Sequence, residues 1–164
     1  METSNRIFSK TVFTGVFCAL LICMPIGFTE IQAAPASVVG AVKHIKSGML
    51  ERQDGNAIWI PLSQDGVIRA GDRLRTGPDG VAVLTLTKVG VVLMKSNTEY
   101  TVGSNPMNFK TILHRGYLWI RTSLAHGAKL DISASGAVAG VRGTRVSILS
   151  DEQGVDVCTC TGNV

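Results

Sequence analysis

The chain has 164 residues, of which 45% are hydrophobic, 17% are charged and 5% are aromatic, and its formal net charge is +4. These values predict one globular domain of ordinary size once any targeting segment is set aside. The basic residues are scattered among acidic ones, and the one cluster, Arg69, Arg73 and Arg75, is interrupted by Asp72, so we interpret it as a solvated strand face. A nucleic-acid binder is therefore not expected.

The first residues have the layout of a secretory signal peptide. A short polar stretch with Arg6 and Lys10 precedes an apolar run from Thr11 to Phe28, and the small residues Ala33-Ala34-Pro35-Ala36 follow. This layout predicts that residues 1–36 form a signal peptide and that the protein is exported by the bacterial Sec route to the periplasm or the medium.

We expect cleavage between Ala34 and Ser37. The alternative is an uncleaved anchor, the one membrane contact considered, because about 18 apolar residues reach the lower limit for a spanning helix. Cleavage is favoured because Gly15, Pro25 and Gly27 interrupt the run.

Short runs rich in Val, Ile, Leu and Thr follow, separated by turn residues at intervals of roughly 8 to 12 residues, as in all-β domains. The turn dipeptides are Asp54-Gly55, Asp65-Gly66 and Asp79-Gly80. The predicted strands are Val38–Ile45, Ala57–Leu62, Arg73–Arg75, Val81–Thr87, Val91–Lys95, Thr98–Val102, Lys110–His114, Tyr117–Thr122, Lys129–Ser133, Ala137–Val141, Arg145–Leu149 and Val155–Cys160. We predict a single all-β domain over residues 37–164, built as a β-roll or solenoid-like sandwich.

Two of these runs carry information about burial. In Val81–Thr87, the side chains of Ala82, Leu84 and Leu86 can face a core while Thr85 and Thr87 face water, which predicts one core-facing side and one wet side. The run Val89–Met94 is apolar at every position but Gly90 and predicts a strand that is covered on both sides.

Several blocks resemble the FecR domain family. They are Trp59-Ile60-Pro61-Leu62, Ile68 to Gly77, Asp79 to Leu84, Leu113 to Ile120 and Ala139 to Val146, in the family's order. The motif residues, which we interpret as structural, are Trp59, Pro61, Leu62, Gly71, Asp72, Leu74, Thr76, Gly77, Gly80, Gly116, Val141, Arg142, Gly143 and Thr144. The resemblance spans roughly residues 40 to 160.

The resemblance implies an exported domain that works in envelope signalling. Regulatory FecR proteins are transmembrane relays whose periplasmic domain senses an occupied outer-membrane receptor, while a cytoplasmic segment controls a sigma factor. Only ten residues precede the apolar run here, so the sigma-factor role is not carried over. The sequence stops at Val164 within what resemble the family's last strands, so two alternatives are open: the final strand of the domain is clipped, or the reading frame continues. An edge left open would invite pairing with a partner strand.

Two motif residues have specific expected roles. Asp72 follows Gly71 and is expected to accept backbone N–H bonds that the turn leaves open. Arg142 lies between Gly140 and Gly143, where its donors would satisfy backbone carbonyls at a sheet end; the alternative is that it clamps an anionic ligand.

Cys158 and Cys160 are the cysteines that remain after residue 36, so no disulfide framework is expected. On one strand they would point to the same side and offer two thiolates to a soft metal or a redox partner. Two ligands do not complete a zinc site. The alternatives are buried cysteines or thiols that pair with another chain, and no cofactor is predicted.

Catalysis is not expected. The histidines, His44, His114 and His126, lie outside any recognisable catalytic motif, and most acidic residues lie in turns. The aromatic residues Trp59, Tyr117 and Trp119 could form a sugar- or peptide-binding surface or belong to the core. We therefore predict a non-enzymatic domain for protein interaction or envelope signal sensing, with a protein partner in the envelope. The alternatives are a thiolate protein that uses the cysteine pair, and a carbohydrate- or ligand-binding envelope protein.

Overall fold

A computed structural model describes residues 36–53 and 57–163, which form one all-β unit. The predicted fold class is confirmed, and the predicted signal peptide lies almost wholly outside the described residues. No helix in the described ranges is long and apolar enough to cross a membrane. The strands are β1 (Val38–Ser47), β2 (Leu50–Gln53), β3 (Trp59–Pro61), β4 (Val67–Arg69), β5 (Arg73–Thr76), β6 (Val81–Leu86), β7 (Gly90–Met94), β8 (Glu99–Thr101), β9 (Asn108–Thr122), β10 (Lys129–Ala134), β11 (Ala137–Asp151) and β12 (Gly154–Asn163).

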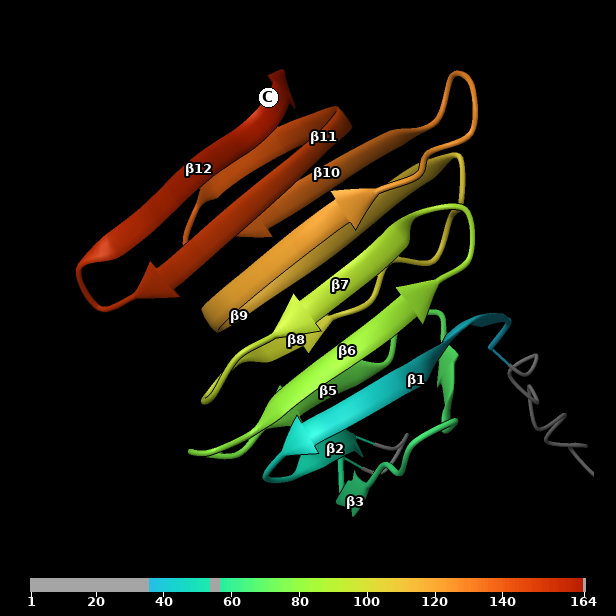
Figure 1. The fold of residues 1–164 in the computed structure, drawn as a ribbon, viewed down its shortest axis with the longest axis vertical. Helices are drawn as coiled ribbons and strands as arrows, with labels where there is room; N and C mark the ends of the chain where they lie inside the picture. Colours follow the sequence, from blue (N-terminus) through green and yellow to red (C-terminus); the bar gives the residue numbers. More distant parts are fainter. Residues whose placement is uncertain (1–35, 54–56, 164) are drawn as a thin grey trace, which may run out of the picture. The chain divides into compact units, whose positions relative to one another are not determined.

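The strands form two layers, which Figure 1 shows with one in front of the other. Sheet A has the order β4-β1-β6-β7-β9-β11-β12, and sheet B has the order β3-β2-β5-β8-β9-β10-β11. Strands β9 and β11 belong to both layers, so the two sheets are one continuous hydrogen-bonded surface that folds over on itself.

Strand β9 passes from one layer to the other at Gly116. Residues 108–115 lie in sheet B, residues 117–122 lie in sheet A, and Gly116 between them has a φ of 89°. The sequence predicted two strands here, and the structure has one strand of 15 residues because glycine bends the backbone without ending the pairing. Strand β11 likewise joins two predicted strands, with Gly143 at a φ of 60°.

One pair of strands is parallel. Strand β10 runs alongside the first half of β9, with Lys129 opposite Asn108 and Ala134 opposite Leu113. A parallel pair requires the chain to travel through the other layer and return. This single coil is the solenoid-like feature of the fold, and the remaining pairs are antiparallel.

The core lies between the layers. As predicted, Ala82, Leu84 and Leu86 of β6 face inward and are buried. Facing them from sheet B are fully buried side chains such as Leu74 and Leu113, each of which contributes about 1.5–3 kcal/mol through burial.

The prediction for Val89–Met94 is wrong for one side of the strand. Val92 and Met94 are buried in the core, but Val91 and Leu93 face away from it and are only half-buried. The apolar run therefore forms a strand that the described residues cover on one side.

The turns at Asp65-Gly66 and Asp79-Gly80 are found where they were predicted, and Asp54-Gly55 lies outside the described residues. Strands β2 and β4 were not predicted, because they are short and contain charged residues. Both lie near the N-terminal end of the two layers, where β4 pairs with β1 and β2 with β5.

We expect Gly116→Ala to be more destabilising than Gly136→Ala. Both glycines have a positive φ, 89° and 84°, so either alanine should cost about 1–2 kcal/mol. Only at position 116 would the new Cβ meet a neighbour, 2.5 Å from Cα of Thr98, whereas nothing lies within 4 Å at position 136. The clash should lower the free energy of unfolding by about 1–3 kcal/mol more. Chemical denaturation measures both, and equal losses would contradict the role given to the crossing.

Candidate functional site

The outer face of sheet B carries a row of ion pairs. Arg75 Nε lies 2.6 Å from Glu51 Oε2, and Arg73 lies 2.6 Å from Glu99, which also contacts Arg115 at 3.4 Å. Arg73 and Arg75 lie on the outer face of their strand, as interpreted from the sequence, with side chains that are 41% and 36% exposed, and each is also paired across the strands. Half-exposed pairs of this kind contribute little to stability individually, so their main effect is to fix the side chains.

Trp59 lies beside this row. The Arg75 guanidinium sits 4.2 Å from the centroid of the Trp59 ring, a cation–π contact. Glu51 holds the same guanidinium through Nε, and the Trp59 ring is half-buried on the sheet face.

Asp72 has the role that the sequence predicted. Its Oδ2 accepts a hydrogen bond from the Arg69 N–H at 2.7 Å, and Gly71 in the same turn has a φ of 82°. Arg52 lies 3.7 Å from the same carboxylate oxygen and donates to the Val67 carbonyl at 3.3 Å. These contacts fasten the turn between β4 and β5 to β2.

Several other motif residues make contacts within the fold. The Thr76 hydroxyl donates to the Lys95 carbonyl and accepts the Thr98 N–H at 3.0 Å, while Leu74 and Val141 are buried. Leu62 packs against the core, and Gly77 and Gly80 flank the turn between β5 and β6. Pro61 is exposed at the end of β3, and the side chain of Thr144 lies outside the described set.

Arg142 does not have its predicted role. It is exposed and makes no hydrogen bond with a backbone carbonyl of a described residue. With Lys129 and Gly143 it lines an open pocket of ≈ 400 Å³ beside the β9–β10 loop. The two glycines do not mark a close backbone approach, since a Cβ at position 143 would have no neighbour within 4 Å and one at position 140 would meet only Asp131 Oδ1 at 3.6 Å.

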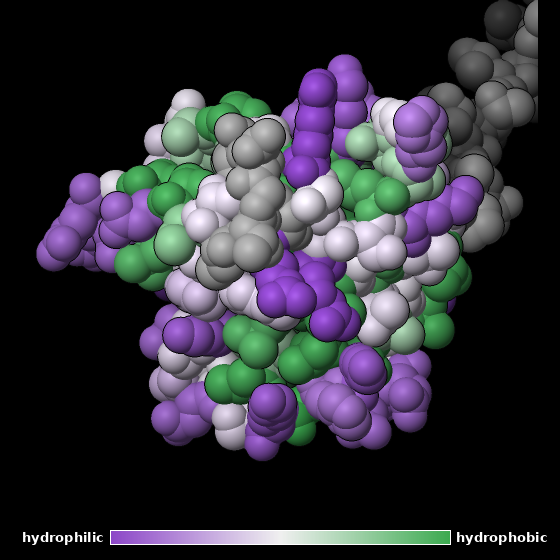
Figure 2. Space-filling view, turned by 45° about the horizontal axis from the view of Figure 1, so that its top comes forward, coloured by the Kyte–Doolittle hydropathy of each residue, from purple (hydrophilic) through white to green (hydrophobic). Residues whose placement is uncertain are grey.

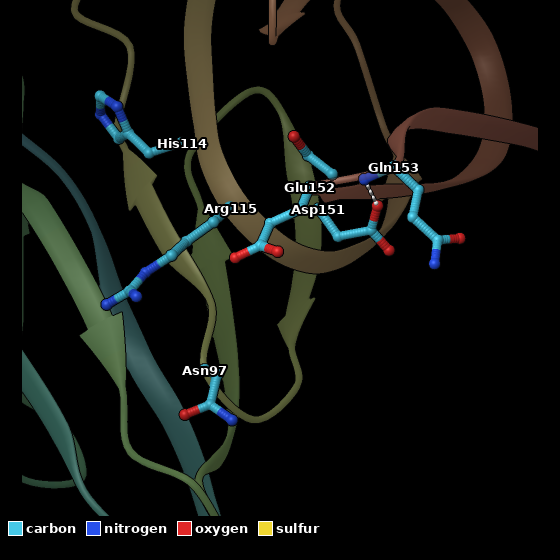
Figure 3. Close-up of a pocket in the computed structure, with 7 residues that line it drawn as sticks. Asn97, His114, Arg115, Asp151, Glu152 and Gln153 are labelled. Atoms are coloured by element: carbon cyan, nitrogen blue, oxygen red, sulfur yellow. Dashed lines mark hydrogen bonds between the residues drawn. The ribbon is translucent and has the colours of Figure 1, made fainter.

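A larger open pocket, ≈ 580 Å³, lies where β9 crosses between the layers (Figure 3). Asn97, His114 and Arg115 lie along one side and the β11–β12 turn along the other. In this turn, Asp151 Oδ1 accepts the Gln153 N–H at 2.8 Å. The remaining lining residues are Ser150 and Glu152.

His114 is the titratable group whose environment is most informative here. Its Nε2 lies 2.8 Å from the Thr101 hydroxyl. Burial lowers the pKa of His114 below 6.5, repulsion from Arg73 lowers it further, and Glu99 opposes both. His44 lies on β1 and His126 in the β9–β10 turn, so the three histidines lie on separate elements.

The outer face of sheet A has a half-buried apolar row. Val83, Leu93 and Trp119 stand opposite one another on β6, β7 and β9, and the row continues to Ser147 and Cys158. The predicted shared face of Tyr117 and Trp119 agrees with this pattern, since Leu118 and Ile120 between them are buried.

The three aromatic residues do not form one surface. Trp59 lies in sheet B, whereas Tyr117 and Trp119 lie in sheet A, where the Lys95 ammonium is 4.2 Å from the Tyr117 ring. The three side chains therefore do not form a single sugar- or peptide-binding surface, and they do not belong to the buried core either.

Strand β12 forms the C-terminal edge of sheet A. It pairs with β11 on one side and with no described strand on the other. From Gly154 to Thr159 its residues are exposed, except for half-buried Val155. In Figure 2, which turns the top of Figure 1 toward the reader, apolar side chains lie at the surface between polar ones.

Next to β12, the two layers stand open and a narrow apolar groove of ≈ 60 Å³ enters between them. The buried side chains of Ile132 and Ile148 form its bottom. Val138 and Val157 lie at its rim, and their side chains are 67% and 45% exposed. We refer to β12 and this groove together as the C-terminal edge.

Cys158 is an exposed free thiol on β12, opposite Ser147. Cys160 lies on the same strand, as predicted, but its side chain is not among those described. Within the described residues, no group of three His, Cys, Asp or Glu side chains could hold a metal ion.

A comparison with models of protein families matches residues 72–164 to the model described as FecR protein. The match begins at Asp72, so it includes the later blocks of the sequence analysis and begins after Trp59–Leu62. No curated protein and no solved structure matches the chain.

We expect Arg73→Met to raise the pKa of His114, because it removes a repulsive charge and releases Glu99 from its ion pair. In the parent protein the lowered pKa means that the unfolded chain binds a proton more readily. His114 therefore adds stability above about pH 6.5 that is lost as the pH falls through its lower folded value. An NMR titration of the imidazole, assigned with His114→Gln, measures the shift. Arg121→Met on sheet A is the control, and an unchanged or lower pKa in Arg73→Met would refute the assignment.

Proposed function

The chain belongs to the FecR protein family, and from this premise we propose that it is an exported, non-catalytic domain that contributes to envelope signalling by binding another protein chain. The family fits a signalling or regulatory role in the bacterial envelope. The observation that carries the proposal is the C-terminal edge, because one side of β12 pairs with no other described strand and can offer its backbone groups to a partner.

An edge strand normally carries features that prevent pairing with other chains, such as lysine, proline or a very short length. Strand β12 has ten residues and includes no Lys, Arg or Pro. Addition of a strand to such an edge supplies main-chain hydrogen bonds, which give affinity without requiring a particular sequence.

The apolar groove beside β12 supports selectivity. Alternate side chains of an added strand point to the same side, so every second residue of a partner would reach Val157 and the rim at Val138. An apolar side chain at such a position would match the aliphatic lining of the groove. Binding at this edge requires no catalytic group.

The proposal is tested with a photo-crosslinking amino acid in place of Val157, in cells that express the full reading frame. We expect a covalent adduct with a second polypeptide, because Val157 is 45% exposed at the groove rim. The matched control places the same amino acid at Lys110, an exposed strand position on the outer face of sheet B. Absence of any adduct at position 157, or equal yield at both positions, would reject the edge as the binding site.

A further inference from the structure

We propose that the chain which occupies the C-terminal edge is a second copy of this protein, whose β1 edge pairs head to tail with β12. The inference rests on the proposed function, since it names the partner of the same edge. It is argued from strand direction, charge and the distribution of exposed apolar residues.

Strand direction permits this pairing. From β1 to β12, sheet A contains six strands, β1-β6-β7-β9-β11-β12, and each neighbouring pair is antiparallel. The two outer strands therefore run in opposite directions, and a second copy placed next to the first would set its β1 antiparallel to β12. The alternation of the sheet would continue across the contact.

The second half of β1 is available for pairing. Strand β4 covers β1 only from Val38 to Ala41, and the turn before β4 bonds to Val42. Beyond that point, Lys43, His44 and Lys46 are exposed. His44 lies opposite Val83 of β6, Lys43 and Lys46 lie at the two register shifts of this pair, and no described strand pairs with this part of β1 on its other side. In Figure 1 this end of β1 and the β11–β12 turn lie on the same side of the molecule, so stacked copies bring them together.

The two edges have opposite charge. From Ser147 to the end of the sequence the charged residues are Asp151, Glu152 and Asp156, all acidic. The free part of β1 carries Lys43 and Lys46. Lysines on an edge repel other basic edges but attract an acidic one, so charge selects this pairing.

The same charges disfavour the simplest alternative, a two-fold pair of β12 strands. That arrangement would place the acidic turn and Asp156 of each copy near those of the other, and like charges across a strand pair are destabilising. A head-to-tail contact is heterologous, so it joins more than two copies, in an open chain or, where the rotation between copies closes, in a ring.

Exposed apolar residues concentrate at the two ends that would meet. Of the eight large hydrophobic side chains that are exposed in the described residues, four lie near the N-terminal end and two at the C-terminal edge. They are Val38, Met49, Ile58 and Val67 at one end and Val138 and Val157 at the other. Burial of such side chains is the usual source of affinity in protein contacts.

The experiment is sedimentation velocity of the purified protein, expressed from its full reading frame, over a wide range of concentration. We expect species that grow with concentration beyond a dimer. K43E/K46E and E152K/D156K should each weaken association by roughly tenfold or more. An equimolar mixture of the two variants should restore it, because each then meets an edge of opposite charge. K88E/K110E is the control for K43E/K46E, since it makes the same change in net charge, and melting curves check that all variants fold.

Three results would overturn the inference: a monomer at every concentration, a dimer that K43E/K46E does not weaken, or a mixture that fails to recover association. A monomeric protein that still forms an adduct with a different protein at position 157 would overturn this inference alone. A monomer without any adduct would also overturn the proposed function.

Discussion

The fold depends on one strand that must serve two layers. Strand β9 pairs with β8 and β10 in sheet B and with β7 and β11 in sheet A. It can do so because Gly116 bends the backbone where Thr98 lies so close that a Cβ would reach within 2.5 Å of its Cα. The Thr98 hydroxyl also accepts the Tyr117 N–H at 3.0 Å, which holds the bend in place. Without this crossing the sheets would have no shared strand at their centre.

The crossing also explains where the surface features lie. Just before Gly116, β9 presents His114 and Arg115 to the ion pairs of sheet B and to the pocket at the β11–β12 turn. Just after it, the same strand presents Tyr117 and Trp119 to the apolar outer face of sheet A. One strand thus contributes to two different surfaces: the charged outer face of sheet B before Gly116 and the apolar outer face of sheet A after it.

The sequence predicted the class of fold and most strands, because alternation and turn dipeptides are local signals. It also predicted the bond from Arg69 N–H to Asp72, since that contact spans only three residues. It could not predict that β9 and β11 are continuous, because a glycine that ends a strand and one that bends it look alike. The pairing of Arg75 with Glu51 spans 24 positions and follows from the sheet order, which no local pattern contains. Arg142 shows the opposite error: flanking glycines were interpreted as close packing where the backbone is open.

The two edges of sheet A differ in a way that stability alone does not require. An isolated β-sandwich gains most from protecting both edges, since any open edge invites aggregation. Here lysines accompany the free part of β1, and β4 covers the rest, whereas β12 has neither a covering strand among the described residues nor a basic side chain. The groove beside β12 adds exposed apolar surface at the same place. Such surface is a liability in a monomer but is what a strand-adding partner uses. The asymmetry therefore favours binding as the reason for this edge, and in the proposed assembly the charges on the two edges select the chain that fills it.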